Sequence, residues 1–378
     1  MSVIHRAAVA SAAGVAAAAT AAFVLAPAAG AQARSSGSSF IGHFHHLKTI
    51  ASTVPGNGDV NPYGTVVIRH SQGDLQRGNV LISNFNNKKN LQGTGRTIVQ
   101  ITPGGQLSVF AKINPNHLPG PCPGGIGLTT ALTVLPGGWV VAGSLPTRNG
   151  MAATAKAGCL LVLDSTGHVR ETISGHGING PWDMTSVSSG HLSQLFVTNV
   201  LNGTVAANGK VVHRGTVLRL TLARYGSQPP AVKNITKIGS GFPQRTDPGA
   251  LVIGPTGVGL SRNGTLYVAN SLVSSINAIP DAVFRPSDAG PGMVVSSGGK
   301  LNVPLGLTLA PNGNVLTVNG ADGRIVETTP GGVQVASRFL DKSGSPPGAG
   351  ALFGLAVAPS GTGLYYVDDA VNTLRLLH

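Results

Sequence analysis

Charged and aromatic residues are scarce in this chain of 378 residues, at 10% and 4% of the sequence. Glycine is abundant instead, with 54 residues, and proline contributes another 25. Beyond the N-terminal region, no stretch has the pattern of a long amphipathic helix or a membrane span, which argues against a helical bundle. Many short strands joined by glycine-rich turns fit this composition, so we expect an all-β fold.

Cysteine is almost absent, since the chain has only Cys122 and Cys159. Their spacing does not form a zinc motif. Both lie in the part of the chain that would be exported, and an oxidising compartment makes a disulfide between them reasonable. Two buried thiols are the alternative.

The N-terminus has the composition of a secretory signal. A basic start and an alanine-rich apolar stretch are followed by small residues at Ala31 and Ala33. This order predicts a signal peptide over residues 1–33 and a short linker over 34–39, and therefore a secreted or periplasmic protein. An uncleaved anchor is the alternative, although a stretch dominated by alanine is only weakly stable in a membrane.

Basic residues outnumber acidic ones, and the formal net charge is +13. A basic exported protein suits anionic wall polymers, lipid headgroups or polysaccharides. The basic residues are scattered, however, and the nearest approach to a run is Lys88 with Lys89. No aromatic residues are interleaved with them, which argues against specific binding of nucleic acid. A solvated basic surface is the simpler interpretation.

A repeated pattern organises the rest of the chain: a Pro or Gly, an apolar run, a turn, and a second apolar run. The pattern starts six times, near Pro62, Gly124, Pro181, Pro255, Pro304 and Leu352. Third and fourth strands follow in most units, and this predicts a six-bladed β-propeller of four-stranded blades in one domain over residues 40–378. The last unit is one strand short. We expect a lone strand at residues 46–54 to complete it and close the ring.

The repeat resembles the NHL-repeat propellers, and the segments at residues 304–319 and 352–368 match best. A more distant similarity extends to gluconolactonase and regucalcin propellers and to propeller lyases acting on cyclic peptides. The resemblance implies the architecture, but such propellers include both enzymes and binding modules. Lactonase-type sites in that group use a Glu at the entrance to the first blade. This chain has Asp59 and Asn61 there, and no Glu.

Polar residues at the ends of the six second strands are expected to meet around the central channel. They are Asn84, Ser144, Asn199, Asn270, Asn319 and Asp368. Oxygen ligands of this kind suit Ca²⁺ or another divalent cation, and we take Asn270 and Asp368, together with Asp183, as candidate metal ligands. The alternative is that these side chains bind the backbone of nearby turns, and their repetition in every unit favours it.

Residues that break the repeat are stronger candidates for function. Trp182 and Asp183 occupy the position where other units have x-Gly, which predicts a catalytic carboxylate at the channel entrance with Trp182 as a ligand contact. A hydrogen bond that caps the strand is the alternative role of Asp183. His176 is a candidate catalytic base and His117 a candidate ligand contact, because both lie in loops that lead into blades. Solvated loop histidines are the alternative.

The tract from His43 to His46 has metal-ligand residue types. It is expected on the closing strand, where alternation would put His43 and His45 on one face and His46 on the other.

Two classes of function remain. The sequence has no Gly-x-Ser-x-Gly motif for nucleophilic catalysis. The only glutamates, Glu171 and Glu327, are expected on outer strands. We therefore favour a rigid, monomeric binding platform for a protein, an envelope polymer or a small ligand at the channel face. The alternative is a metal-dependent hydrolase or lyase, lactonase-like, with its site at the central channel.

Overall fold

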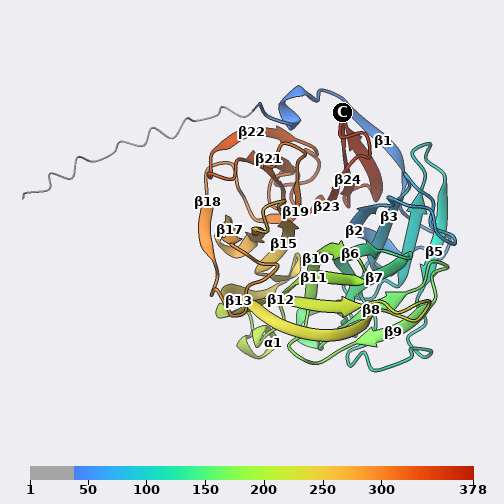
Figure 1. Ribbon diagram of the computed structural model, residues 1–378. Helices are drawn as coiled ribbons and strands as arrows, with labels where there is room; N and C mark the ends of the chain where they lie inside the picture. Colours follow the sequence, from blue (N-terminus) through green and yellow to red (C-terminus); the bar gives the residue numbers. More distant parts are fainter. Residues whose placement is uncertain (1–37) are drawn as a thin grey trace, which may run out of the picture. The chain divides into compact units, whose positions relative to one another are not determined.

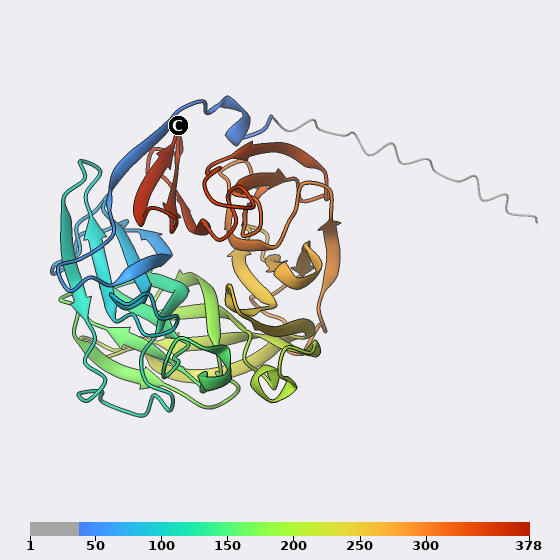
Figure 2. The same cartoon turned by 180° about the vertical axis from the view of Figure 1, so that it is seen from behind.

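Six antiparallel sheets surround a common axis in the computed structural model, which describes residues 38–378 (Figures 1 and 2). The expected all-β propeller of six blades is confirmed. The signal peptide predicted over residues 1–33 lies outside the described residues, as does most of the linker predicted over 34–39. Within residues 38–378 no helix is both long enough and apolar enough to cross a membrane.

Each blade begins with its innermost strand and adds the next strands outward. Blade 1 has β2 (Val60–Val67), β3 (Val80–Asn86), β4 (Thr97–Ile101) and β5 (Leu107–Lys112). Blade 2 has β6 (Leu128–Leu135), β7 (Trp139–Ser144), β8 (Cys159–Leu163) and β9 (Val169–Ile173). Blade 3 has β10 (Pro181–Ser189), β11 (Leu192–Asn199), β12 (Val212–Ala223), β13 (Ala231–Asp247) and the additional β14 (Leu251–Ile253).

The second half of the ring is more regular. Blade 4 has β15 (Pro255–Leu260), β16 (Leu266–Asn270), β17 (Ser275–Ile279) and β18 (Met293–Ser297). Blade 5 has β19 (Pro304–Leu309), β20 (Val315–Asn319), β21 (Arg324–Thr328) and β22 (Gln334–Phe339). Blade 6 has β23 (Leu352–Val357), β24 (Leu364–Asp368), β25 (Thr373–Leu377) and, from the other end of the chain, β1 (Leu47–Ser52).

The ring closes as expected, because β1 pairs antiparallel with β25 from Leu47 opposite Leu377 to Ser52 opposite Thr373. The segment before β1 is fixed by Glu327 on β21. The Glu327 carboxylate accepts hydrogen bonds from the backbone N–H groups of Phe40 and Ile41, at 2.8 and 2.9 Å. Closure therefore joins the N-terminal segment to blade 5 as well as to blade 6.

One prediction about the closing segment was wrong. His43 belongs to the short 3₁₀ helix η1 (Ile41–His43), and β1 begins only at Leu47. The histidine tract therefore does not alternate across a strand. Its three histidines are exposed.

The predicted start of blade 2, near Gly124, was also wrong. A turn at Gly124 precedes β6, which begins at Leu128. A disulfide joins Cys122 in that loop to Cys159 on β8, with an S–S distance of 2.12 Å. The loop into blade 2 is therefore tied covalently to the third strand of the same blade.

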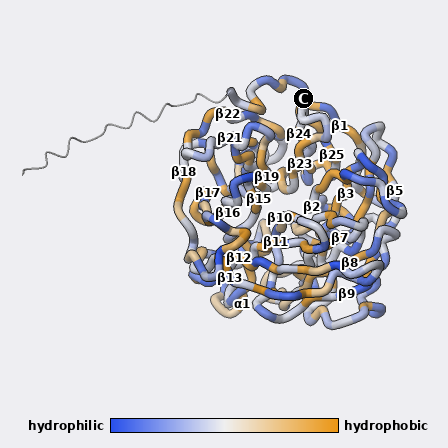
Figure 3. Tube along the Cα trace, viewed as in Figure 1, coloured by the Kyte–Doolittle hydropathy of each residue, from blue (hydrophilic) through white to orange (hydrophobic). Residues whose placement is uncertain are grey.

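The repeated glycine of the first strands is needed because neighbouring blades approach closely. A Cβ on Gly306 would collide with the carbonyl oxygen of Phe353 in the next blade, and one on Gly354 would collide with that of Tyr63. Side chains fill the remaining space between blades. In Figure 3 hydrophobic and hydrophilic segments alternate within the blades, as expected for strands packed between neighbours and joined by polar turns.

Three short helical turns lie in the connections between the second and third strands of blades 2, 3 and 4. They are η2 (Ala152–Thr154), α1 (Thr204–Ala207) and η3 (Ser271–Val273).

Candidate functional site

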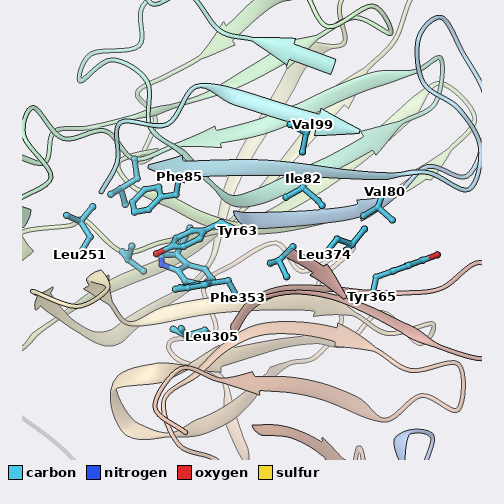
Figure 4. Packing of buried hydrophobic residues seen from close by; sticks show 14 of the residues in the cluster. Tyr63, Val80, Ile82, Phe85, Val99, Leu251, Leu305, Phe353, Tyr365 and Leu374 are labelled. Carbon is cyan, nitrogen blue, oxygen red and sulfur yellow. The ribbon is translucent and has the colours of Figure 1, made fainter. Parts of the chain in front are cut away.

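The central channel is closed at the end where the first strands begin. Tyr63 stacks on Phe353 with ring centroids 3.9 Å apart, and on its other neighbour Phe85 at 4.5 Å. Trp182 approaches the Tyr63 ring from across the axis, at 6.2 Å. Leu251, Leu305 and their neighbours complete the packing (Figure 4). We call Tyr63, Trp182, Leu251, Leu305 and Phe353 the axial cluster.

The axial cluster draws on several blades because large apolar residues recur at one level of the first strands. Tyr63, Trp182, Leu305 and Phe353 each follow the first residue of the repeat in their blade. Burial raises the pKa of the Tyr63 hydroxyl well above its ordinary value, as expected for a group cut off from water. This end of the channel is solid core.

The other end of the channel is hollow. A cavity of about 650 Å³ is lined by the first strands of all six blades. Its wall is mixed, with hydroxyl-bearing residues such as Thr65, Thr133 and Thr308 beside apolar ones such as Leu260 and Leu355. Arg69 and His70, in the turn after β2, line the cavity at its mouth.

Asp183 lies at the inner end of this cavity and is only 7% exposed. Its two carboxylate oxygens accept hydrogen bonds from backbone N–H groups, Met184 at 2.8 Å and Val258 of blade 4 at 3.0 Å. Its own backbone N–H donates to Thr198 Oγ1 at 3.1 Å, and that hydroxyl donates to Thr256 O. Asp183 therefore links blade 3 to blade 4 inside the channel.

The environment of Asp183 favours its neutral form. Burial raises the pKa of the carboxyl to about 8, although the hydrogen bonds from Val258 and Met184 act in the opposite direction. No ion pair of the described residues includes Asp183. A carboxylic acid that keeps its proton near neutral pH is available for proton transfer.

Comparison with protein-family models finds no match, and comparison with curated protein sequences finds none either. Solved structures do match. A calcium-binding regucalcin from Agrobacterium tumefaciens strain C58 has a TM-score of 0.56 and 14% identity, covering 88% of this chain and 93% of that one. A gluconolactonase from Xanthomonas campestris has a TM-score of 0.53 and 14% identity, covering 88% of each chain.

A streptogramin B lyase is similar as well, with a TM-score of 0.50 and 14% identity over 88% of this chain and 97% of that one. The chain is thus similar in fold to six-bladed propellers of the gluconolactonase and regucalcin type. At these identities the likeness concerns the fold alone.

The ring of second-strand ends does not form a metal site at the axis. The Asn84 amide donates to Thr53 O at 3.1 Å, and the Asn319 amide donates to Lys300 O at 2.7 Å. Asn199 accepts a hydrogen bond from the backbone N–H of Asn179, and Ser144 donates to Gly125 O. These side chains bind the loops that lead into their own blades, which is the structural role considered as the alternative.

Several oxygens in this ring nevertheless lack a protein partner. They are the Oδ1 atoms of Asn84, Asn270, Asn319 and Asp368, each in a different blade. The axial cluster fills the space between these blades at the axis, and residues 38–378 contain no cluster of three His, Cys, Asp or Glu side chains placed for a metal ion. The residues present therefore do not fit the axial divalent cation expected from the second-strand ends.

The three candidate metal ligands lie apart. Asp183 faces the cavity, while Asn270 ends β16 and does not line it. Asp368 accepts a hydrogen bond from Arg375 Nη1 at 2.8 Å. Burial is the main cause that raises the pKa of Asp368, and the bond from Arg375 acts against it. The expectation that these residues converge was wrong.

The candidate histidines are also separate from the cavity. His117 and His176 are exposed in loops between blades, and neither lines the cavity. The His117 ring lies 3.1 Å from Asn114 Nδ2, and His176 occupies a turn with φ of 50°. Trp182 does not reach the cavity either, because its ring belongs to the axial cluster.

The loop into blade 1 contains structural polar contacts. Asp59 accepts hydrogen bonds from Arg96 N and Thr97 Oγ1, both at 2.9 Å. Asn61 Nδ2 donates to Asp369 Oδ2 at 2.9 Å. Burial, with a smaller effect of nearby Asp368, raises the pKa of Asp369 to about 7. Asp369 was not among the predicted site residues, and its only signal in the sequence is the Asp-Asp pair at the end of β24.

Proposed function

We propose that the propeller binds a small organic molecule in its central cavity and acts on it as a hydrolase or lyase, with Asp183 transferring the proton. The observation that carries this proposal is the cavity of about 650 Å³ with a single buried carboxyl group at its inner end. Cavities of roughly 300–1,000 Å³ are typical of small-molecule sites. All six blades contribute to this one, so a bound molecule would contact the whole ring.

The state of Asp183 suits acid catalysis. With its pKa raised to about 8, the carboxyl holds a proton near neutrality that it can donate to a departing oxygen. The axial cluster closes the channel beneath it, so water and substrate reach Asp183 only from the open mouth. A dry inner end strengthens electrostatic interactions with a bound substrate.

Fold analogy supports chemistry of this class, since the similar structures include a gluconolactonase and a streptogramin B lyase. The analogy is limited to the architecture. We propose no step through a divalent cation, because the axial cluster fills the space at the axis and four of the six second-strand ends bind the loops into their own blades.

Activity of an Asp183→Asn variant tests the proposal. We would assay wild type and variant against a panel of lactones, esters and cyclic depsipeptides. We expect kcat/KM of the variant to fall by about 100-fold or more, with ligand affinity retained. Wild-type activity should decline as pH rises through about 8, where Asp183 loses its proton.

Glu171→Gln provides the matched control, because Glu171 is an exposed carboxylate on the outermost strand of blade 2. Its activity should equal that of wild type. An Asp183→Asn variant as active as wild type would contradict the proton-transfer role.

The second candidate is a binding module without chemistry. The observation that favours it is that both Asp183 oxygens already accept backbone hydrogen bonds, a duty that needs no catalysis. In that case ligands bind in the cavity, no member of the panel is turned over, and Asp183→Asn changes stability alone.

We also propose that the protein is exported, as its N-terminal sequence predicts. The Cys122–Cys159 disulfide supports this, because structural disulfides persist in oxidising compartments. N-terminal sequencing of the protein recovered from the culture medium or periplasm should give residue 34 first. A mature protein beginning at Met1 in the cytosol would contradict export.

A further inference from the structure

The mouth of the cavity has an excess of positive charge. The mouth consists of the six turns that join first to second strands, at residues 68–79, 136–138, 190–191, 261–265, 310–314 and 358–363. Their charged or titratable residues are Arg69, His70, Asp74, Arg77, His191 and Arg262. The turns of the mouth therefore carry three arginines and one aspartate. A field of one sign at a cavity mouth attracts ligands of the opposite charge.

Arg69 is the arginine that reaches the cavity. It lines the cavity together with His70, whereas Arg77 and Arg262 do not. Arg69 is exposed and takes part in no ion pair within residues 38–378. Its guanidinium is therefore free to bind an acid group, for which arginine offers two parallel N–H donors.

Asp183 and Arg69 mark the two ends of the cavity. Equivalent β-bulges place Asp183 of β10 at the level of Gly64 of β2, since the register shifts between Pro62 and Thr65 and between Pro181 and Met184. Arg69 follows Gly64 by five residues, which corresponds to roughly 16 Å along an extended strand. A molecule that contacts both ends is therefore elongated.

The wall between these ends is mixed, with aliphatic and hydroxyl-bearing side chains. Leu132, Met184, Val258, Leu307 and Leu355 line it one residue beyond the level of Asp183. Each belongs to a different blade. Thr65 occupies the same level in blade 1, and Thr133, Thr185 and Thr308 follow at the next level. The wall therefore suits a body with both apolar and hydrogen-bonding groups.

We propose that the ligand is an elongated organic acid, with its carboxylate bound by Arg69 at the mouth, a partly apolar body along the mixed wall, and a hydrogen-bonding oxygen at Asp183. This inference rests on the proposed function and specifies its substrate class. It also explains why the arginines lie at the mouth of the channel and the carboxyl group lies at its inner end. A carboxylate fits the basic mouth and would be poorly placed beside the acid at the inner end.

The test uses a library of organic acids of about 8–20 Å, each paired with its primary amide, which removes the charge and keeps the shape. Binding to the full chain would be screened by thermal shift and measured by calorimetry. For wild type we expect acids to bind at least about tenfold tighter than their amides, the usual worth of a charge-assisted hydrogen bond. Added salt should reduce this preference.

Arg69→Met should remove about tenfold of the acid preference and leave affinity for the amides unchanged. Arg262→Met is the matched control, because it removes the same charge from the same mouth at a residue that does not line the cavity. It should retain the acid preference within about twofold.

The outcomes separate the inference from the proposed function. Equal binding of acids and amides by wild type, or an acid preference that survives in Arg69→Met, overturns the inference and leaves the cavity as a ligand site. A library in which nothing binds, or binding that is unaffected when Thr308→Trp fills the cavity, overturns the proposed function itself. Circular dichroism of Thr308→Trp confirms that the variant is folded.

Discussion

The two ends of the central channel are built from the same six strands, yet one end is solid and the other is hollow. At the closed end the first strands contribute large residues, among them Tyr63, Trp182 and Phe353, which stack across the axis. Three residues further along, the same strands carry small residues such as Thr308 and Ala356 in the wall of the cavity. Side-chain size at two levels therefore decides which end accepts a ligand.

Asp183 lies between these two levels. It occupies the position of a repeated glycine, so its side chain has to point into the little space that neighbouring blades leave at the channel. The Trp182 ring is directed to the closed end, while the Asp183 carboxyl faces the open one. One dipeptide thus contributes to both regions, and substitutions in it separate their roles.

The largest expected effect concerns the charge state of Asp183. Its pKa is about 8 in the folded protein, against 3.8 ordinarily. Below about pH 4 the Asp183 carboxyl is neutral in both the folded and the unfolded protein, so its ionisation does not change the free energy of unfolding. As pH rises from about 4 to 8, ionisation stabilises the unfolded chain only, so wild-type stability falls, by a total on the order of 5 kcal/mol.

Asp183→Asn cannot ionise, so its stability should lack this decline. Urea unfolding of both proteins between pH 4.5 and 8.5 measures the difference between their pH profiles. Asp369, whose pKa is also raised, contributes equally to both proteins. Parallel profiles for wild type and variant would show that Asp183 is not held neutral by burial.

A smaller effect is expected when the closed end is opened. Trp182→Ala removes the ring that faces Tyr63 across the axis, and we expect a loss of about 4 kcal/mol, typical of a buried aromatic residue. Leu309→Ala, at the half-buried wall of the open cavity, should cost only about 1 kcal/mol, because its surroundings already contain solvent.

Phe284→Ala is the control for both variants. Phe284 is 78% exposed, so its removal should change the free energy of unfolding by less than about 0.5 kcal/mol. Denaturant titrations of the three variants at one pH give the comparison. Similar losses for Trp182→Ala and Leu309→Ala would mean that the two ends are packed alike.

The fold was predictable from sequence because its requirements are local. The glycine that allows blades to approach recurs in most repeats, and the turn after the first strand and the polar end of the second strand recur in all of them. The missing fourth strand of the last blade likewise predicted the pairing of β1 with β25. The start of blade 2 was predicted wrongly at Gly124, because a glycine-containing turn precedes β6 and resembles the Pro or Gly that starts the other units.

The site was predictable only in part. Asp183 stood out because it replaces a repeated glycine, but its depth and its hydrogen bond from Val258 depend on the neighbouring blade. The cavity depends on side-chain sizes at one level in six separate strands, which no single repeat reveals. Arg69 was missed because it lies in an irregular turn, whose length was its only signal.

The last prediction concerns the second-strand ends at the closed end. Asn319 donates to Lys300 O and to Asp322 Oδ1, so Asn319→Ala should cost about 1–2 kcal/mol. Adding Ca²⁺ or EDTA should shift the melting temperature of neither protein, because the axial cluster fills the position that a shared cation would need. Calorimetry with Ca²⁺ and EDTA is the measurement. A melting temperature that rises with Ca²⁺ in wild type but not in Asn319→Ala would show that the unpartnered oxygens bind a cation, and that the closed end also has a ligand.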